Sequence, residues 1–168
     1  MAGAPVAQAI LAAGEILTGI GSSTLGKTDG MEVRILTSGE TAVLGRVAEG
    51  VFDNPVDPAL AAEFLADPRH AICVAIEDGV VIGFASGVRY VHPDKPSEFW
   101  INEVGVAPAF RRRGAGKAVV AGLIAHAKAQ GCREAWVLTD EDNVAARAMY
   151  RSAGGAETPA GLMVTYVL

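Results

Sequence analysis

The chain has 168 residues, enough for one domain, and 51% of them are hydrophobic, which excludes a wholly disordered protein. Its formal net charge of −5 argues against nucleic-acid binding and favours cationic small molecules or basic peptides as partners. Cys73 and Cys132 lie far apart and without a metal-binding neighbour. We therefore expect inert thiols in a reducing cytoplasm, with neither a disulfide framework nor a zinc site.

The first thirty residues are rich in Ala, Gly, Ile and Leu. A secretory signal needs a basic first segment, and no Lys or Arg precedes Lys27. Gln8, Glu15 and several glycines interrupt the apolar run, so it is too short to cross a membrane. Residues 6–17 favour a short helix, and residues 19–30 have the composition of a flexible linker. We predict that residues 1–30 lie outside the fold and that residues 31–168 form a single domain.

Alternating strand and helix signals begin at Met31. Residues 31–36 form the first predicted strand, and a helix follows from Thr41 to about Glu49. A loop with two prolines leads to a short helix over residues 58–66, with a proline in its first turn. The Asp78-Gly79 pair between two apolar runs predicts a β-hairpin over residues 71–91.

The second half of the chain predicts a strand–helix–strand–helix unit. A proline-containing turn precedes a strand over residues 98–106, and the helix over 114–130 ends at Gly131. A strand over 133–139, a helix over 143–153 and a terminal strand over 161–168 complete the chain. This order indicates an α/β (α+β) fold in which helices flank one mixed, mostly antiparallel sheet.

Three arginines and two glycines stand between the strand that ends at Val106 and the long helix. A Walker A loop is excluded because Ala118 follows Lys117, and a Rossmann fingerprint because residue 119 is valine. Backbone amides of a glycine turn at a helix start can hold a pyrophosphate. The alternative is a solvated basic loop that begins the helix, and this stretch by itself does not separate the two.

A second motif decides between them. Asn143 and Tyr150 are two turns apart on one helix face, with Ala146 between them. Together with Arg111-x-x-Gly114-x-Gly116, this pattern resembles the paired motifs of the GCN5-related N-acetyltransferase family over roughly residues 31–168. The resemblance implies a sheet with a splayed strand pair that holds acetyl-CoA as co-substrate.

The resemblance also implies roles for individual residues. The turn and helix start would hold the coenzyme pyrophosphate, and the strand end would supply an amide that polarises the acetyl carbonyl. Asn143 would bond the pantetheine arm, and Tyr150 would protonate the leaving thiolate; otherwise Tyr150 is a core aromatic. The residues expected at the coenzyme are Val104, Gly105, Val106, Arg111, Arg112, Arg113, Gly114, Ala115, Gly116, Lys117, Asn143, Ala146 and Tyr150.

The candidate general base is Glu103. Strict strand alternation puts it on one face with Phe99 and Ile101, where apolar neighbours raise a carboxyl pKa toward the range of a useful base. The alternative is an ordinary solvent-facing carboxylate at a strand end. His92 and His126 are weaker candidates, because one lies in a turn and the other lies well inside the long helix.

The acceptor is expected to be a small cationic amine. The order of the turn, the Ser-Glu pair and Glu103 is similar to the subgroup that acetylates the 3-amino group of aminoglycosides, which would imply a role in antibiotic resistance. Asp53, Asp57 and residues 140–142 add negative charge to predicted loops. Alternatives are a protein or peptide amine as acceptor, or a CoA-binding regulatory module without catalysis. We expect no metal, membrane or nucleic-acid partner, and the family often forms homodimers.

Overall fold

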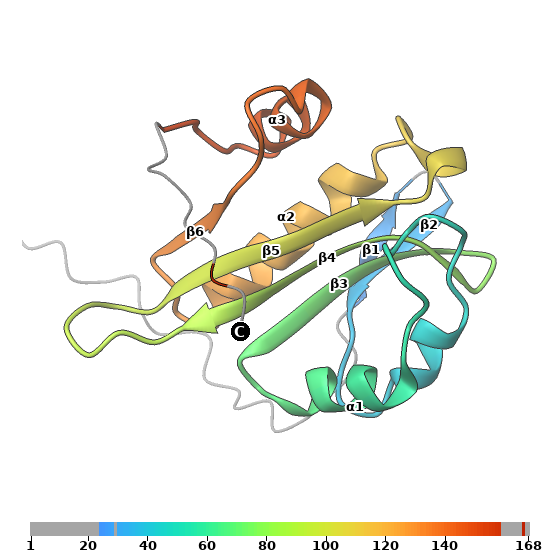
Figure 1. Cartoon of the computed structure of the whole chain (residues 1–168), viewed down its shortest axis with the longest axis horizontal. Helices are drawn as coiled ribbons and strands as arrows, with labels where there is room; N and C mark the ends of the chain where they lie inside the picture. Colours follow the sequence, from blue (N-terminus) through green and yellow to red (C-terminus); the bar gives the residue numbers. More distant parts are fainter. Residues whose placement is uncertain (1–23, 29, 159–165, 167–168) are drawn as a thin grey trace, which may run out of the picture.

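The computed structural model describes residues 24–28, 30–158 and 166 (Figure 1). The strands are β1 (Thr24–Thr28), β2 (Met31–Ile35), β3 (His70–Glu77), β4 (Val80–Tyr90), β5 (Glu98–Val106) and β6 (Glu134–Val137). The helices are η1 (Thr41–Gly45), α1 (Pro58–Ala66), η2 (Pro108–Phe110), α2 (Ala115–Ala129) and α3 (Val144–Ser152). In the described part of the chain, the strands form one sheet in the order β1 to β6, antiparallel except for the parallel β5–β6 pair.

Local sequence signals account for most of these elements. Asp78 and Gly79 both have positive φ, 50° and 73°, as a two-residue turn between twisted strands requires, and the predicted β3–β4 hairpin is confirmed. Helix α1 begins at Pro58, and the Asp57 carboxylate caps it by accepting from the amides of Ala59 at 2.7 Å and Leu60 at 3.2 Å. The Asp57 carboxylate therefore binds the amides at the start of α1, where its negative charge stabilises the helix.

Two expectations for the amino-terminal half are wrong. Residues 24–28 are the edge strand β1, paired antiparallel with β2, although their stretch had the composition of a linker. An edge strand is held by backbone hydrogen bonds to its neighbour, which composition does not report. The helix expected through Glu49 is only the 3-10 helix η1, because the chain then forms a parallel bridge between Val47 and Val81.

The sheet carries a buried cluster on each face. Helix α2 packs across β2 to β5 and buries Val119, Val120 and Leu123 against one face. The second cluster lies on the other face, where α1 packs on β3 and η1 on β4. Figure 1 shows α1 and α2 on different sides of the strands, with α3 standing beyond α2 at the end of β6.

Two further expectations concern the chain as a whole. None of the helices among the described residues is long and apolar enough to cross a membrane. The terminal strand predicted over residues 161–168 lies outside the described residues, except for Tyr166, as do residues 1–23 of the expected extension.

Candidate functional site

The sheet opens between β5 and β6. The two strands pair only from Glu98 with Glu134 to Ile101 with Val137. Beyond this point β5 continues to Val106, while the chain after β6 turns away toward α3 (Figure 1). The carboxyl half of β5 therefore presents backbone amide and carbonyl groups along an open edge, where an extended ligand can add as a strand would.

A bulge in β5 changes the orientation of Glu103. Gly87 pairs with Ile101 and the preceding Ser86 pairs with Glu103, so Asn102 is the extra residue. Glu103 therefore lies on the face opposite Phe99 and Ile101, and the face predicted by strict alternation is wrong. The family resemblance implies a bulged strand at residues 104–106, whereas the bulged residue here is Asn102, just before that stretch. An isolated glycine within a strand pattern, here Gly87, is the sequence signal that could have indicated it.

The bulge is fixed by side-chain contacts on both strands. The Ser86 hydroxyl lies 3.1 Å from Asn102 Oδ1 and donates to it, and Ser86 is buried. A Cβ at position 87 would overlap the Phe99 ring and the Trp100 carbonyl oxygen, so only glycine fits opposite the bulge. The orientation of Glu103 is thus set by packing between strands.

An acidic loop lies beside Glu103. The loop carbonyl of Val51 crosses β5 so closely at Gly105 that a Cβ there would overlap it, which explains the glycine at this candidate position. Phe52 stacks on Phe84 with ring centroids 4.0 Å apart, which holds the loop on the sheet. Although Glu103 is exposed, partial burial raises the pKa of its carboxyl, and the charge of Asp53 raises that pKa further.

The arginine-glycine turn forms the start of α2. Arg112 and Gly114 have left-handed backbones, with φ of 64° and 84°. The helix has no side-chain cap and no acidic residue in its first turn, so its positive end carries no anionic group of its own. This fits an anion such as a pyrophosphate, which would be held by the backbone amides of the turn and first helical residues.

The other arginines of the turn have structural partners. Arg111 Nε donates to the Val106 carbonyl at 3.2 Å and so connects the turn to the end of β5. Arg113 forms an ion pair with Glu77 at 2.5 Å and lies over the Phe110 ring. These contacts hold the turn in place. An anion bound there would therefore be held by the backbone amides of the turn.

The start of α2 lies against β5 and α3. A Cβ at Gly116 would meet Val106 Cγ2 at 3.4 Å and Met149 Cγ at 3.7 Å, so the missing side chain allows close packing of the three elements. Ala115 is buried at the same place, whereas Lys117 is exposed. The turn, the strand end and α3 thus meet around the open edge of β5.

Helix α3 places Asn143 and Tyr150. The Asn143 side-chain carbonyl caps the helix by accepting from the Ala146 amide at 3.1 Å, so this oxygen already has a partner. Tyr150, two turns later, packs with Val104 and Val106 against the α2 side of the core. Burial raises the pKa of its phenol, which keeps the hydroxyl protonated at neutral pH.

The two candidate catalytic side chains lie on opposite faces of the sheet. Tyr150 belongs to the α2 side, with Val104. Glu103 belongs to the other side, with Ser86 and the Asp53 loop. A group held in the plane of the sheet, between β5 and the chain that leaves β6, would therefore have a carboxylate on one side and a phenol on the other.

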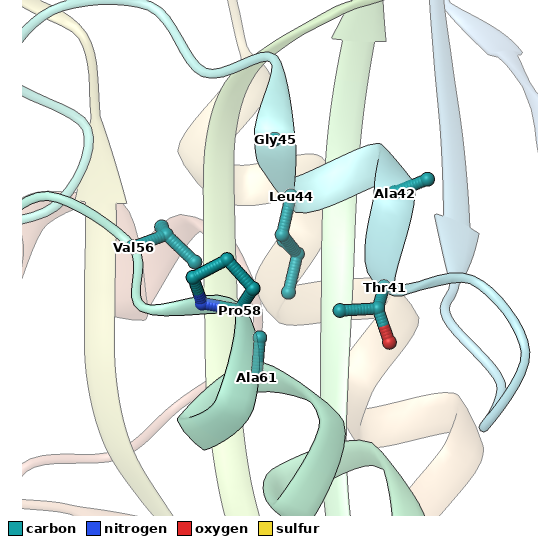
Figure 2. A pocket seen from close by; sticks show the side chains of 7 residues that line it. All are labelled: Thr41, Ala42, Leu44, Gly45, Val56, Pro58 and Ala61. Atoms are coloured by element: carbon teal, nitrogen blue, oxygen red, sulfur yellow. The ribbon is translucent and has the colours of Figure 1, made fainter.

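Other candidates do not join this arrangement. His92 lies 3.5 Å from Glu98 and packs edge-on against Tyr90, at the far end of β5. Cys73 is buried, which raises the pKa of its thiol to about 12 and makes it inert, as predicted. A cavity of about 150 Å³ opens between η1 and α1 (Figure 2). Its lining is nearly all apolar and contains none of the candidate residues.

Comparison with known proteins identifies a family. The family model described as "Acetyltransferase (GNAT) family" matches residues 44–154. The N-alpha-acetyltransferase RimI of Mycobacterium tuberculosis is 35% identical over 104 residues, which cover 62% of this chain and 63% of that protein. Aminoglycoside N(6')-acetyltransferase type 1 of Salmonella typhimurium is 32% identical over 111 residues, covering 62% of this chain and 77% of that protein. The chain thus spans less than two thirds of the length of the mycobacterial relative.

Solved structures share the fold. Aminoglycoside acetyltransferase AAC(6')-Iy, in complex with the bisubstrate analogue CoA-S-monomethyl-acetylneamine, has a TM-score of 0.67 and 25% identity over 82% of this chain and 99% of that chain. An aminoglycoside acetyltransferase from an uncultured soil metagenomic sample, in complex with trehalose, has a TM-score of 0.70 and 17% identity, covering 83% and 97%. By its family match and its fold, the chain belongs to the acetyltransferase (GNAT) family.

Proposed function

We propose that the protein is an acetyl-CoA-dependent N-acetyltransferase that acts on a primary amine of a small cationic acceptor by direct attack. One observation carries the proposal: β5 has an open edge beside the uncapped start of α2, and Glu103 and Tyr150 lie on opposite faces of the sheet. Acetyl-CoA supplies an activated acetyl thioester. The amides of residues 112–117 would bind its pyrophosphate, and the open edge of β5 would pair with its extended arm.

The two side chains divide the proton transfers. An acceptor amine is protonated at neutral pH, and Glu103, with its raised pKa, accepts one of its protons directly or through a water. The neutral nitrogen then attacks the acetyl carbonyl, so that a carbon–nitrogen bond forms and the carbon–sulfur bond breaks. The nitrogen gives up its second proton to solvent, from which Tyr150 is reprotonated after it has donated its own proton. The Tyr150 hydroxyl donates its proton to the departing sulfur, and its raised pKa keeps that proton in place until then.

The charge of the site favours a cationic acceptor. Asp53 lies close enough for its charge to raise the pKa of Glu103, so an ammonium group that binds between the two carboxylates relieves their repulsion. Two of the relatives described above are named for the 6'-amino group of aminoglycosides. We propose an aminoglycoside-type amine, and a screen should include acceptors with free 3-amino and 6'-amino groups.

A protein α-amine is the second candidate, and the similarity to an N-alpha-acetyltransferase favours it. Release of free thiol from acetyl-CoA, measured with a panel of aminoglycosides and of peptides with free amino termini, separates the two candidates. Glu103→Gln and Tyr150→Phe should each lower turnover at least about tenfold, the low end of what a general acid or base contributes.

A non-catalytic CoA-binding module is tested by the same measurements. Such a module binds CoA in calorimetry and releases no thiol with any amine. Failure of the wild-type protein to bind CoA at all would refute the proposed coenzyme site itself.

A further inference from the structure

Two tryptophans stack beside the open edge of the sheet. Trp100 on β5 and Trp136 on β6 are paired across the two strands, with ring centroids 5.5 Å apart and planes 13° apart. Trp100 remains 38% exposed. The tryptophans form the second-last pair of the parallel ladder, since only Ile101 and Val137 follow before the strands separate. An exposed aromatic surface thus lies next to the place where the acetyl group would be transferred.

The bulge at Asn102 puts this surface on the same face as Glu103. Trp100 pairs with Val88 and Glu103 pairs with Ser86, two residues further along β4. Because residues two apart on a strand share a face and rise about 3.3 Å each, Trp100 and Glu103 stand roughly 7 Å apart along the sheet. This spacing allows one small ring compound to contact both side chains.

Carboxylates lie near the aromatic pair. Asp53 lies beside Glu103, and Glu134 begins β6 two residues before Trp136. Glu98, on the same strand as Trp100, forms an ion pair with Lys95. Along β5, the exposed indole of Trp100 lies between Glu98 and Glu103. Negative charge beside an aromatic face attracts cations to that face.

We propose that Trp100 and Trp136 form the acceptor-binding platform and that its occupant is a polycationic amino sugar. The reacting amine reaches Glu103 while a second ammonium group of the same molecule lies over the exposed indole of Trp100. A peptide amino terminus offers one ammonium group and a flexible chain, so it uses this platform less well. The proposal rests on the proposed function for the identity of the reacting amine, whereas binding to the platform is independent of turnover.

Intrinsic fluorescence tests the platform directly, because the chain contains two tryptophans and both belong to the pair. The wild-type protein, loaded with CoA so that no reaction occurs, is titrated with neamine. We expect a saturable change in tryptophan emission. The neutral sugar trehalose should give no change, and a tetrapeptide with a free amino terminus should give a change only at higher concentration. No change with neamine, or tighter binding of the peptide, would overturn the proposal.

Kinetics separates this proposal from the proposed function. Trp100→Leu should raise the KM for neamine about 3- to 10-fold, with kcat and the KM for acetyl-CoA within about twofold of wild type. Trp100→Phe keeps a weaker aromatic face, so its KM for neamine should lie between those of wild type and Trp100→Leu. This variant also provides a test if the leucine variant does not fold. Leu60→Ala, at an exposed apolar residue on α1, is the matched control and should leave all constants unchanged.

The outcomes are distinct. If wild-type protein acetylates neamine but the KM of Trp100→Leu is unchanged, the platform is wrong and the proposed function stands. If no amine is acetylated although neamine changes the fluorescence, the platform stands and the proposed function fails.

Discussion

Gly105→Ala tests whether the acidic loop is held against β5. An alanine Cβ at this position would lie 2.7 Å from a ring carbon of Phe84 and closer still to the Val51 carbonyl oxygen. Ordinary contact begins at 3.4 Å, so relief of the two contacts requires a shift of about 0.7 Å at the Phe84 ring and a larger one at the Val51 carbonyl. Neither yields easily, because Phe84 is fully buried and stacked on Phe52.

Overpacking of this kind typically costs about 1–3 kcal/mol. For a chain of this length, each kcal/mol lowers Tm by about 2–4 °C, so we expect a fall of about 4–8 °C for a cost near 2 kcal/mol. The displaced loop also carries Asp53 away from Glu103. Since a shift of this size at a site can cost up to about 100-fold in rate, we expect kcat/KM to fall at least about tenfold.

The assay is thermal unfolding together with thiol-release kinetics, and Gly39→Ala is the matched control. A Cβ at Gly39 meets nothing within 4 Å and φ there is not positive, so its Tm should equal or slightly exceed that of wild type. If Gly105→Ala unfolds within about 1 °C of Gly39→Ala, the close crossing of the loop over β5 is wrong.

Three further changes have defined outcomes. In wild type, kcat/KM should rise as pH increases through the raised pKa of Glu103, and Glu103→Gln should abolish that rise. Folding raises the pKa of Glu103, so the ionised carboxyl destabilises the folded protein at pH values above that pKa. Glu103→Gln removes this charge and should therefore raise Tm at neutral pH. The gain should vanish near pH 4, where the carboxyl is protonated in both the folded and the unfolded chain. Asp57→Ala should cost about 1 kcal/mol through loss of the α1 cap, measured by urea unfolding, with unchanged KM for acetyl-CoA. Gly114→Ala should cost about 1–2 kcal/mol through its left-handed φ of 84°, since no atom lies within 4 Å of the new Cβ; a larger loss would contradict a purely backbone origin.

Much of the fold could be predicted from local signals. The two-residue turn at Asp78 and Gly79, the Pro58 helix start and the glycines that bound α2 each fix a boundary through backbone constraints within a few residues. The family resemblance was likewise carried by residues in two short motifs. Edge strand β1 could not be predicted in this way, because its hydrogen bonds belong to pairing with β2.

For the candidate site, too, local sequence and tertiary structure determined different features. The sequence by itself determined which chemical groups are present: a glycine turn at a helix start, a carboxylate in β5, and an asparagine and a phenol on one helix face. Only the tertiary structure decided on which face Glu103 stands, because one extra residue at Asn102 reverses the alternation of everything after it. Packing of the loop on β5 brought Asp53 to Glu103, and the pairing of β5 with β6 stacked Trp100 on Trp136. Both depend on contacts between segments far apart in the chain.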